Sequence, residues 1–239
     1  MKKILILLLV MIVMAPAGMA QEKQKKAKTK KNLPSPLVEV WGGMGLSSIT
    51  GNIASSKFRL TGLFGAGFTM PLTQQNHLHF EGAYSFQGFN YKPTSFQVDD
   101  DTSVYLEESD QRMNYFILTV QDKYFIDKKR TYYVNGGFYL SYLSHARFQA
   151  NYELKVEGQP DEHREIDDGN KDDFTGVDFG LTAGVGVRLG NKALSNFTIE
   201  ARMTYGLVNI AKESPASNDP SARNIYGVLK LGIDIPVRN

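Results

Sequence analysis

The chain has 239 residues, 42% of them hydrophobic, and a formal net charge of +2. It contains no cysteine, which excludes a disulfide framework and any cysteine-based metal or catalytic site. After residue 20 no stretch reaches the roughly 18 consecutive apolar residues of a transmembrane helix. The positive balance comes from the N-terminal region, so it does not indicate a nucleic-acid-binding domain.

Residues 1–20 have the pattern of a secretory signal peptide. Lys2 and Lys3 precede an apolar run at 4–14, and Gly18-Met19-Ala20 offers small residues for cleavage. An uncleaved anchor helix is the alternative interpretation of the same run.

Residues 21–36 are expected to form a basic, flexible periplasmic segment. Its first part, 21–31, holds six lysines and one glutamate, and it ends in Leu33-Pro34-Ser35-Pro36. A solvated tail and electrostatic contact with an anionic envelope polymer or lipid are both open. Without residues 1–31 the chain has 19 basic and 24 acidic residues, so the predicted folded domain, 37–239, is mildly acidic.

Eight stretches of the remaining chain alternate between apolar and polar residues. A period of two places successive side chains on opposite faces, which predicts strands. The pattern is strongest from 174 to 208, where the polar face consists of glycine, hydroxyl-bearing and charged residues. The predicted strands are 37–46, 58–72, 77–91, 112–126, 131–148, 174–190, 197–208 and 224–235.

The connections between these strands alternate in length. Those after the second, fourth and sixth strands are short, whereas those after the first, third, fifth and seventh are long. Short turns at one end and long loops at the other are typical of outer-membrane barrels, whose apolar faces contact lipid. The sequence therefore predicts an all-β fold, an eight-stranded antiparallel up-and-down transmembrane β-barrel. A lipocalin-like soluble barrel, with its apolar residues inside, is the alternative.

The alternation continues into two of the long loops, at 103–106 and 151–156. These segments predict that the third to fifth strands protrude beyond the lipid, with a tight turn near 99–102. Ordinary mobile loop is the alternative.

The segment 113–143 carries a family resemblance. Lys123-Tyr124-Phe125, a tight turn and Tyr133-Val134-Asn135-Gly136-Gly137 resemble the Bacteroidetes outer-membrane β-barrel domain, also called porin family or PorT-like. The resemblance covers about residues 37–235, although Thr119 stands where that family usually has a proline. It implies an outer-membrane barrel, and the PorT-like name implies a link to type IX protein secretion.

Charged residues of both signs fall on the predicted inward face. An eight-stranded barrel is just wide enough for its side chains, so a balanced, paired network is expected there. The predicted interior network comprises Glu39, Arg59, His79, Glu81, Lys123, Asp178, Arg188, Glu200, Arg202, Lys230 and Asp234.

Three interpretations of this interior are open: an interlocked polar plug, a narrow ion path or proton-sensitive core through His79, and a buried catalytic set. The chain has neither G-x-S-x-G nor H-E-x-x-H. His145 lies near Ser141 and Ser144 at the predicted outer rim, but such neighbours are usually without catalytic meaning. We therefore expect a protein that is not an enzyme and has no cofactor, with a lipid-modifying enzyme at the rim as an alternative.

The long loops are acidic. Neither acidic run has the calcium-loop spacing with its fixed glycine and distal glutamate, so solvated loops are expected and a calcium site is the alternative. The residues concerned are Asp99, Asp100, Asp101, Asp167, Asp168, Asp172 and Asp173.

The functional prediction is a closed outer-membrane barrel that acts through acidic extracellular loops in surface interaction or envelope integrity. The alternatives are a small-solute porin and an accessory barrel of type IX secretion. The expected partners are outer-membrane lipid, lipopolysaccharide and an extracellular or envelope protein, and no nucleic acid. We expect both termini in the periplasm.

Overall fold

The structure is a computed structural model that describes residues 33–52, 56–99, 102–156, 162–190, 196–212 and 221–237. The predicted signal peptide and nearly all of the basic segment therefore lie outside the described residues. Pro34–Asn239 form one compact unit, built almost entirely from antiparallel strands. A single turn of 3-10 helix, η2 (Lys171–Asp173), interrupts them. In the described part of the chain, no helix is long and apolar enough to cross a membrane.

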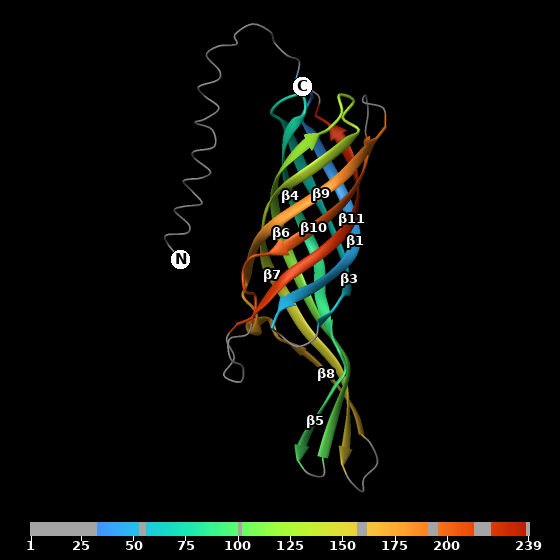
Figure 1. The fold of residues 1–239 in the computed structure, drawn as a ribbon, viewed down its shortest axis with the longest axis vertical. Coiled ribbons are helices and arrows are strands. Elements are labelled where there is room, and N and C mark those ends of the chain that lie inside the picture. Colours follow the sequence, from blue (N-terminus) through green and yellow to red (C-terminus); the bar gives the residue numbers. More distant parts are fainter. Residues whose placement is uncertain are drawn as a thin grey trace, which may run out of the picture. The chain divides into compact units, whose positions relative to one another are not determined.

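Eight strands close into a ring, which confirms the predicted up-and-down barrel (Figure 1). Each strand pairs with its predecessor in the ring, and the last pairs with the first from Leu37↔Pro236 to Gly51↔Ala222. Closure leaves no free sheet edge within the ring. The ring strands are β1 (Leu37–Gly51), β3 (Arg59–Pro71), β4 (Asn76–Tyr91), β6 (Thr102–Phe125), β7 (Tyr132–Val156), β9 (Val177–Leu189), β10 (Asn196–Gly206) and β11 (Ala222–Pro236).

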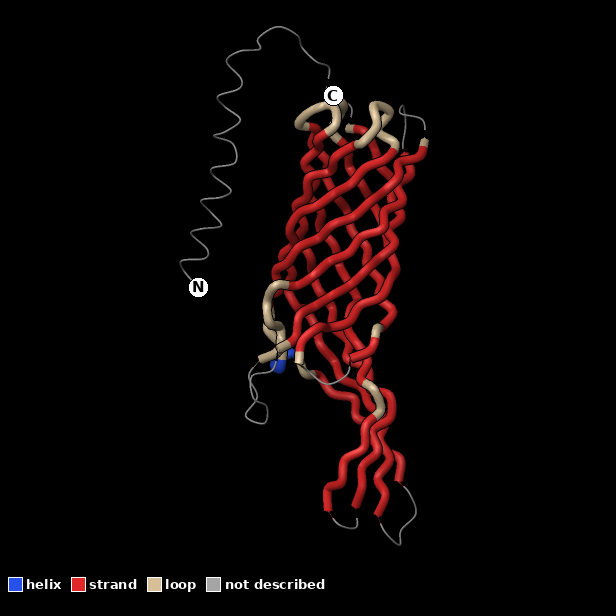
Figure 2. Tube along the Cα trace, in the orientation of Figure 1, coloured by secondary structure: helices blue, strands red, loops and turns tan. Residues whose placement is uncertain are grey.

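A four-stranded sheet continues the ring at the end opposite the short turns (Figure 2). The far ends of β6 and β7 pair with each other there, β5 (Thr94–Asp99) pairs with β6, and β8 (Glu162–Gly169) pairs with β7. We call this sheet, β5-β6-β7-β8, the extension. The predicted continuation of strand structure through 103–106 and 151–156 is confirmed in β6 and β7, whereas the third strand, β4, ends at Tyr91 and the turn predicted near 99–102 lies partly outside the described residues. The two-residue strand β2 (Ser56–Lys57) adds a short pairing with β4.

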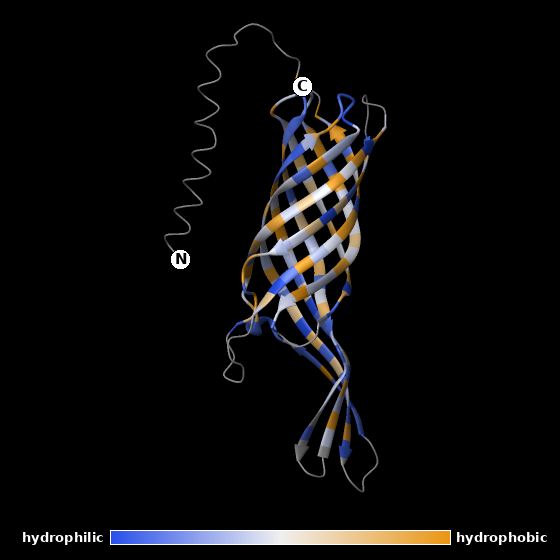
Figure 3. Cartoon of the chain, viewed as in Figure 1, coloured by the Kyte–Doolittle hydropathy of each residue, from blue (hydrophilic) through white to orange (hydrophobic). Residues whose placement is uncertain are grey.

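Side chains of the ring alternate between the two faces, visible as alternating colours along the strands in Figure 3. On β10 the burial pattern is strictly alternating: Phe197 is 61% exposed, whereas its neighbour Thr198 is 2% exposed. The outward positions of the other strands are likewise large and apolar, such as Leu118 at 63% exposure and Leu231 at 57%. A continuous outward apolar band around a closed barrel is the surface that a lipid bilayer covers.

The interior has two halves of different character. Toward the short turns it holds most of the charged side chains. Toward the extension it is filled by aromatic and aliphatic side chains, and the indole of Trp41 lies between the halves. The apolar half includes Leu63, Phe89, Met113, Tyr115, Ile117, Tyr139, Leu143, Phe174, Ile210, Tyr226 and Val228.

Two glycines of β9 make room for tyrosines of β7. A Cβ on Gly186 would lie 2.3 Å from the ring of Tyr133, and one on Gly180 would lie 2.5 Å from the ring of Tyr139. Each tyrosine ring therefore lies over the glycine that faces it on the neighbouring strand β9. This explains why the polar face of 174–190 is rich in glycine.

Two features of β7 and β8 differ from the predictions. β8 falls in what the sequence suggests is loop, because its residues are exposed and charged and show no apolar alternation. In β7 the register shifts between Asn114↔His145 and Tyr115↔Leu143, which leaves Ser144 as a bulged residue. Leu143 and Ala146 consequently both face inward, so one alternating strand over 131–148 is an incomplete description.

Gly186→Ala should destabilise the barrel by about 1–3 kcal/mol, because the new methyl group displaces the Tyr133 ring in a filled interior. The measurement is the urea midpoint of the protein refolded in detergent micelles. Gly176→Ala is the matched control, since a Cβ there meets no atom within 4 Å. Equal midpoints for the two variants would contradict this account of the glycine face.

Candidate functional site

Seven of the predicted interior residues meet in one cluster in the turn-side half of the barrel. They come from β1, β4, β6, β10 and β11, strands distant in sequence that the closed ring brings together. All seven are at most 6% exposed. We call this the central charge cluster: Glu39, His79, Glu81, Lys123, Glu200, Arg202 and Lys230.

Glu81 is the most heavily bonded member. The Arg202 guanidinium binds both of its oxygens, with Nη2 3.0 Å from Oε1. Lys230 Nζ contacts the same Oε1, and His79 Nε2 lies 2.9 Å from it. One buried carboxylate thus connects β4 to β10 and β11 through charge-assisted hydrogen bonds.

Glu39 holds the other side of the cluster together. Its Oε2 lies 3.2 Å from Lys230 Nζ, 3.3 Å from His79 Nε2 and 3.8 Å from Lys123 Nζ. Its Oε1 accepts a hydrogen bond of 2.9 Å from the Thr198 hydroxyl. Glu39 therefore links the β1–β11 seam to β4 and β6.

Glu200 and the neighbouring aromatic rings complete the cluster. Glu200 accepts from Arg202 Nε at 2.6 Å and from the Tyr133 hydroxyl at 3.0 Å. Lys123 Nζ lies 4.6 Å from the Tyr133 ring centroid, and Lys230 Nζ lies 4.3 Å from that of Trp41. The rings stabilise the buried cations by their negative faces.

The charges of the central charge cluster balance when His79 is neutral, with three glutamates facing two lysines and one arginine. Isolated charges in such a site would be very costly, whereas paired and hydrogen-bonded ones persist. His79 Nδ1 is 2.7 Å from the Thr69 hydroxyl, so both ring nitrogens have partners. The arrangement is chemically an interlocked set of ion pairs.

Glu39, His79 and Glu81 place three potential metal-ligand atoms within 4.8 Å of one another. It is the one such group of three within the described ranges. The Lys230 ammonium and the Arg202 guanidinium occupy the space beside these atoms. Two cations in direct contact disfavour a divalent metal, because ligand oxygens would have to exchange partners against like-charge repulsion.

Asp178 stands apart from the cluster, in the apolar half of the lumen. It is fully buried and accepts hydrogen bonds from the Tyr139 hydroxyl at 2.7 Å and from Asn224 Nδ2 at 2.9 Å. Among the described residues no basic side chain pairs with it, and its Oδ1 has no hydrogen-bond partner. Asp178 is therefore held by neutral donors alone.

The three remaining predicted interior charges lie at the two ends of the lumen. Arg188 Nε is 3.1 Å from Asp234 Oδ2 near the short turns. Arg59 Nε is 2.5 Å from Asp110 Oδ1 at the extension end, where both side chains are partly exposed. All eleven residues thus lie on the inner face, but in four separate groups.

The apolar half of the lumen is the part of the interior that sequence reasoning misses. Its β6 members, Met113, Tyr115 and Ile117, face inward while Phe116 and Leu118 face lipid. The available signal was the run 113–118, which is apolar on both faces, apart from Asn114. A strand apolar on both faces is buried on both faces.

The acidic residues of the long loops have varied positions. Asp167 accepts hydrogen bonds from both Arg147 Nε and Nη2, the latter at 2.5 Å, and from Gln149 at 3.0 Å, which ties β8 to β7. Asp168 caps the amide of Gly169 at 2.8 Å. Asp172 and Asp173 are exposed in η2, Asp99 ends β5, and Asp100 and Asp101 lie outside the described residues.

The rim serines and histidine do not assemble into a catalytic arrangement among the residues that the structure describes. Ser141 is 4% exposed inside the lumen, and His145 is exposed on the surface. The Ser144 hydroxyl donates to the Asn114 carbonyl at 2.9 Å. The bulge at Ser144 separates the faces on which Ser141 and His145 lie.

Arg202→Ala should lower the free energy of unfolding by about 3–5 kcal/mol, because Glu81 and Glu200 then remain buried without their guanidinium. Arg59→Ala is the matched control, and about 1 kcal/mol or less is expected for its partly exposed ion pair. Urea unfolding in micelles measures both variants. An Arg202 variant no less stable than the Arg59 variant would show that the cluster does not hold the barrel together.

Acidification should release β8 from β7. Hydrogen bonds from Arg147 and Gln149 hold the pKa of Asp167 below its usual value near 3.8. A lowered folded-state pKa means that this contribution is present above about pH 4 and is lost as the pH falls through the folded-state value. Amide hydrogen exchange of 162–169 should accelerate there more than that of β10, and an Asp167→Asn variant should show no such pH step.

Comparison with known proteins agrees with this geometry. A family model described as "Outer membrane protein beta-barrel domain" matches residues 19–212. No curated protein sequence matches the chain.

Several solved barrels are similar at low identity. The Yersinia pestis attachment invasion locus protein Ail is 13% identical with a TM-score of 0.42, covering 85% of this chain and 100% of Ail. Neisserial surface protein A (NspA) is 11% identical with a TM-score of 0.39, and the match covers 84% of this chain and 97% of NspA. OprG of Pseudomonas aeruginosa is 12% identical with a TM-score of 0.39, and the match covers 87% of this chain and 98% of OprG. By the family match over most of its length, the chain belongs to the outer membrane protein beta-barrel domain family and is a protein of the outer membrane.

Proposed function

We propose that this barrel is closed and acts through its extension, in surface interaction or envelope integrity at the cell exterior. Outer-membrane barrels have short periplasmic turns and longer extracellular loops. On that rule the extension lies outside the cell, and both termini lie in the periplasm. The proposal rests on one combination, a filled lumen that continues into an ordered sheet beyond the membrane.

The filled lumen supports a role other than conduction. Residues of five strands bond to one another in the central charge cluster. Between this cluster and the extension, the apolar half holds four large side chains at 0–1% exposure: Phe89, Met113, Tyr115 and Leu143. A continuous water path would require both layers to separate. Separating the ion pairs of the central charge cluster would leave unpaired charges beside the apolar half, which is costly in free energy.

The extension has the composition of a binding surface. By register, Val104 and Leu106 of β6 share one face with Tyr152 and Leu154 of β7, and all four are partly exposed. The opposite face carries Tyr105, Glu153 and Lys155 among others. An apolar strip bordered by charges, clear of the lipid, is typical of protein interaction sites.

The edges of the extension are also available for pairing. In the described part of the chain β5 pairs only with β6, and β8 pairs only with β7. All eight residues of β8 are exposed, and most are charged, which is how proteins prevent indiscriminate edge pairing. Such an edge admits an extracellular or envelope protein partner with complementary charge rather than any passing strand.

Trimming the extension should abolish surface attachment while leaving the barrel intact. The variant replaces 93–107 and 151–165 with Asn-Gly turns. Cells that display it should lose cell–cell aggregation and attachment to matrix-coated surfaces. Heat-modifiable migration on gels reports that the barrel still assembles.

The matched control replaces 213–220, which connect β10 to β11 in the sequence, with a Gly-Ser linker of equal length. Planar bilayers provide a second measurement, in which the wild-type barrel should show no steady current. Attachment unchanged by trimming would exclude the extension as the active part. Open-channel current would favour the small-solute porin, and loss of protein secretion on deletion would favour the accessory role in type IX secretion.

A further inference from the structure

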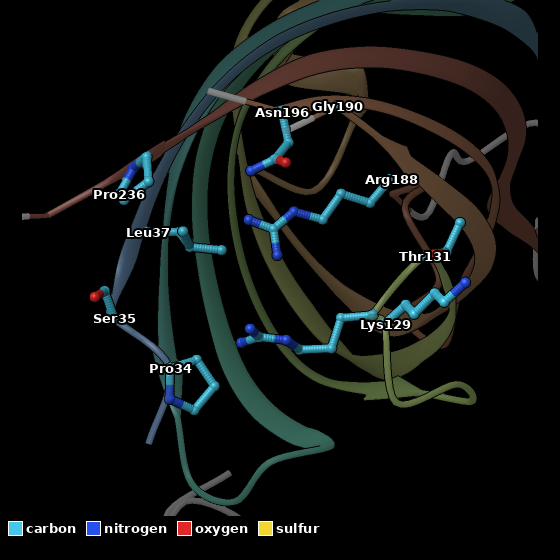
Figure 4. Close-up of a pocket in the computed structure, with 10 residues that line it drawn as sticks. Pro34, Ser35, Leu37, Lys129, Thr131, Arg188, Gly190, Asn196 and Pro236 are labelled. Carbon is cyan, nitrogen blue, oxygen red and sulfur yellow. The ribbon is translucent and has the colours of Figure 1, made fainter. Parts of the chain in front are cut away.

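The mouth of the barrel at the short turns contains a cationic cavity that the proposed function does not use (Figure 4). Its volume is about 430 Å³. Of the described residues that line it, three are basic, Lys129, Arg130 and Arg188, and none is acidic. Figure 4 shows the Arg188 guanidinium directed into the lumen, facing Leu37 and Asn196 across the mouth. From this cationic lining we propose that the cavity binds a phosphate group.

The nearby carboxylates do not neutralise the cavity. Asp127 of the same turn accepts hydrogen bonds from the Thr131 and Tyr132 amides at 2.7 and 2.9 Å, which hold its pKa below the usual value. Asp234 pairs with Arg188, with Oδ2 3.1 Å from Nε, and balances one of the three cations. Among the described residues, Lys129 and Arg130 have no ion-pair partner, so positive charge is left in excess.

The two arginines repel each other in the structure. Partial burial and the positive charge of Arg188 lower the pKa of the Arg130 guanidinium. An anion between them would relieve this repulsion. Guanidinium groups present planar pairs of N–H donors that match phosphate oxygens, and a lysine adds a point charge. Figure 4 shows the Lys129 ammonium directed away from the Arg188 guanidinium, so Lys129 contributes positive charge at the cavity wall and the guanidinium groups supply the directed donors.

Arg130 occupies a backbone conformation that favours glycine. Its φ is 58°, and it is the one non-glycine residue with positive φ in the described chain. A long side chain in this conformation is strained, and such residues concentrate at functional sites. The turn therefore keeps an arginine where glycine would be less strained, which is the pattern of a residue retained for its side chain.

The chain enters the barrel beside this cavity. Pro34 and Ser35 line it, and the six lysines of 21–31 lie shortly before them in the sequence. The phosphate could be presented by a lipid headgroup or by a free phosphate compound. Both sources share the chemistry that the three cations recognise.

The binding test uses the full-length protein in dodecyl maltoside micelles, which contain no phosphate. Calorimetric titration with inorganic phosphate should show saturable binding that is at least tenfold weaker in Lys129→Gln/Arg130→Gln. Lys128→Gln removes a charge from the same turn but not from the cavity lining, and should bind like the wild type. Phosphatidylglycerol in the micelles should abolish the phosphate signal if a headgroup is the source, and leave it unchanged if a free phosphate compound is.

A second variant separates binding from folding. Arg130→Gly removes the side chain and the positive-φ strain together, so it should unfold at an equal or higher temperature while losing at least tenfold in phosphate affinity. Binding that survives both variants, or that is no stronger than with chloride, would overturn the proposal. Tighter binding of succinate than of phosphate would also overturn it.

Discussion

The architecture depends on one constraint, the closure of eight strands around a lumen that their own side chains fill. Closure satisfies every ring strand on both edges, so no backbone group of the ring needs a further strand. It also removes solvent from the inner face. Side chains such as Glu81 and Glu200 must then find partners across the lumen, and those partners come from strands far apart in sequence.

The same constraint explains the division of the lumen into two layers. In a charged layer, each charged atom needs a partner of opposite charge at the right distance. The central charge cluster provides these partners with three carboxylates and three basic groups around His79. An apolar layer needs only complementary shape. Placing the Trp41 ring at the boundary serves both layers, because the ring has an apolar body and a face that attracts cations. Glycines opposite the tyrosines keep the strands close despite these large rings.

The sequence alone was sufficient to predict the ring of eight antiparallel strands. The strict alternation of apolar and polar residues identifies strands such as β9 and β10, because successive side chains of a strand point to opposite faces. The alternation of short and long connections indicates that neighbouring strands run in opposite directions. The partners of each charge could not be predicted, because they depend on shear and register around the whole ring. β8 was not predicted, because its exposed and charged residues show no alternation with apolar ones. The bulge at Ser144 was not predicted either, because one extra residue in a strand does not change its composition noticeably.

The two ends of the barrel differ in charge in a way that the lumen does not require. The interior cluster is balanced. At the short-turn mouth, Lys129 and Arg130 have no ion-pair partner among the residues that the structure describes, whereas β8 and η2 carry exposed carboxylates. Packing inside the ring cannot account for this separation, because both groups lie outside the filled part. Exposed charges contribute little to folding but strongly influence which molecules approach a surface. The interior charges are therefore paired within the fold, whereas the charges at the two ends remain open to other molecules and differ in sign.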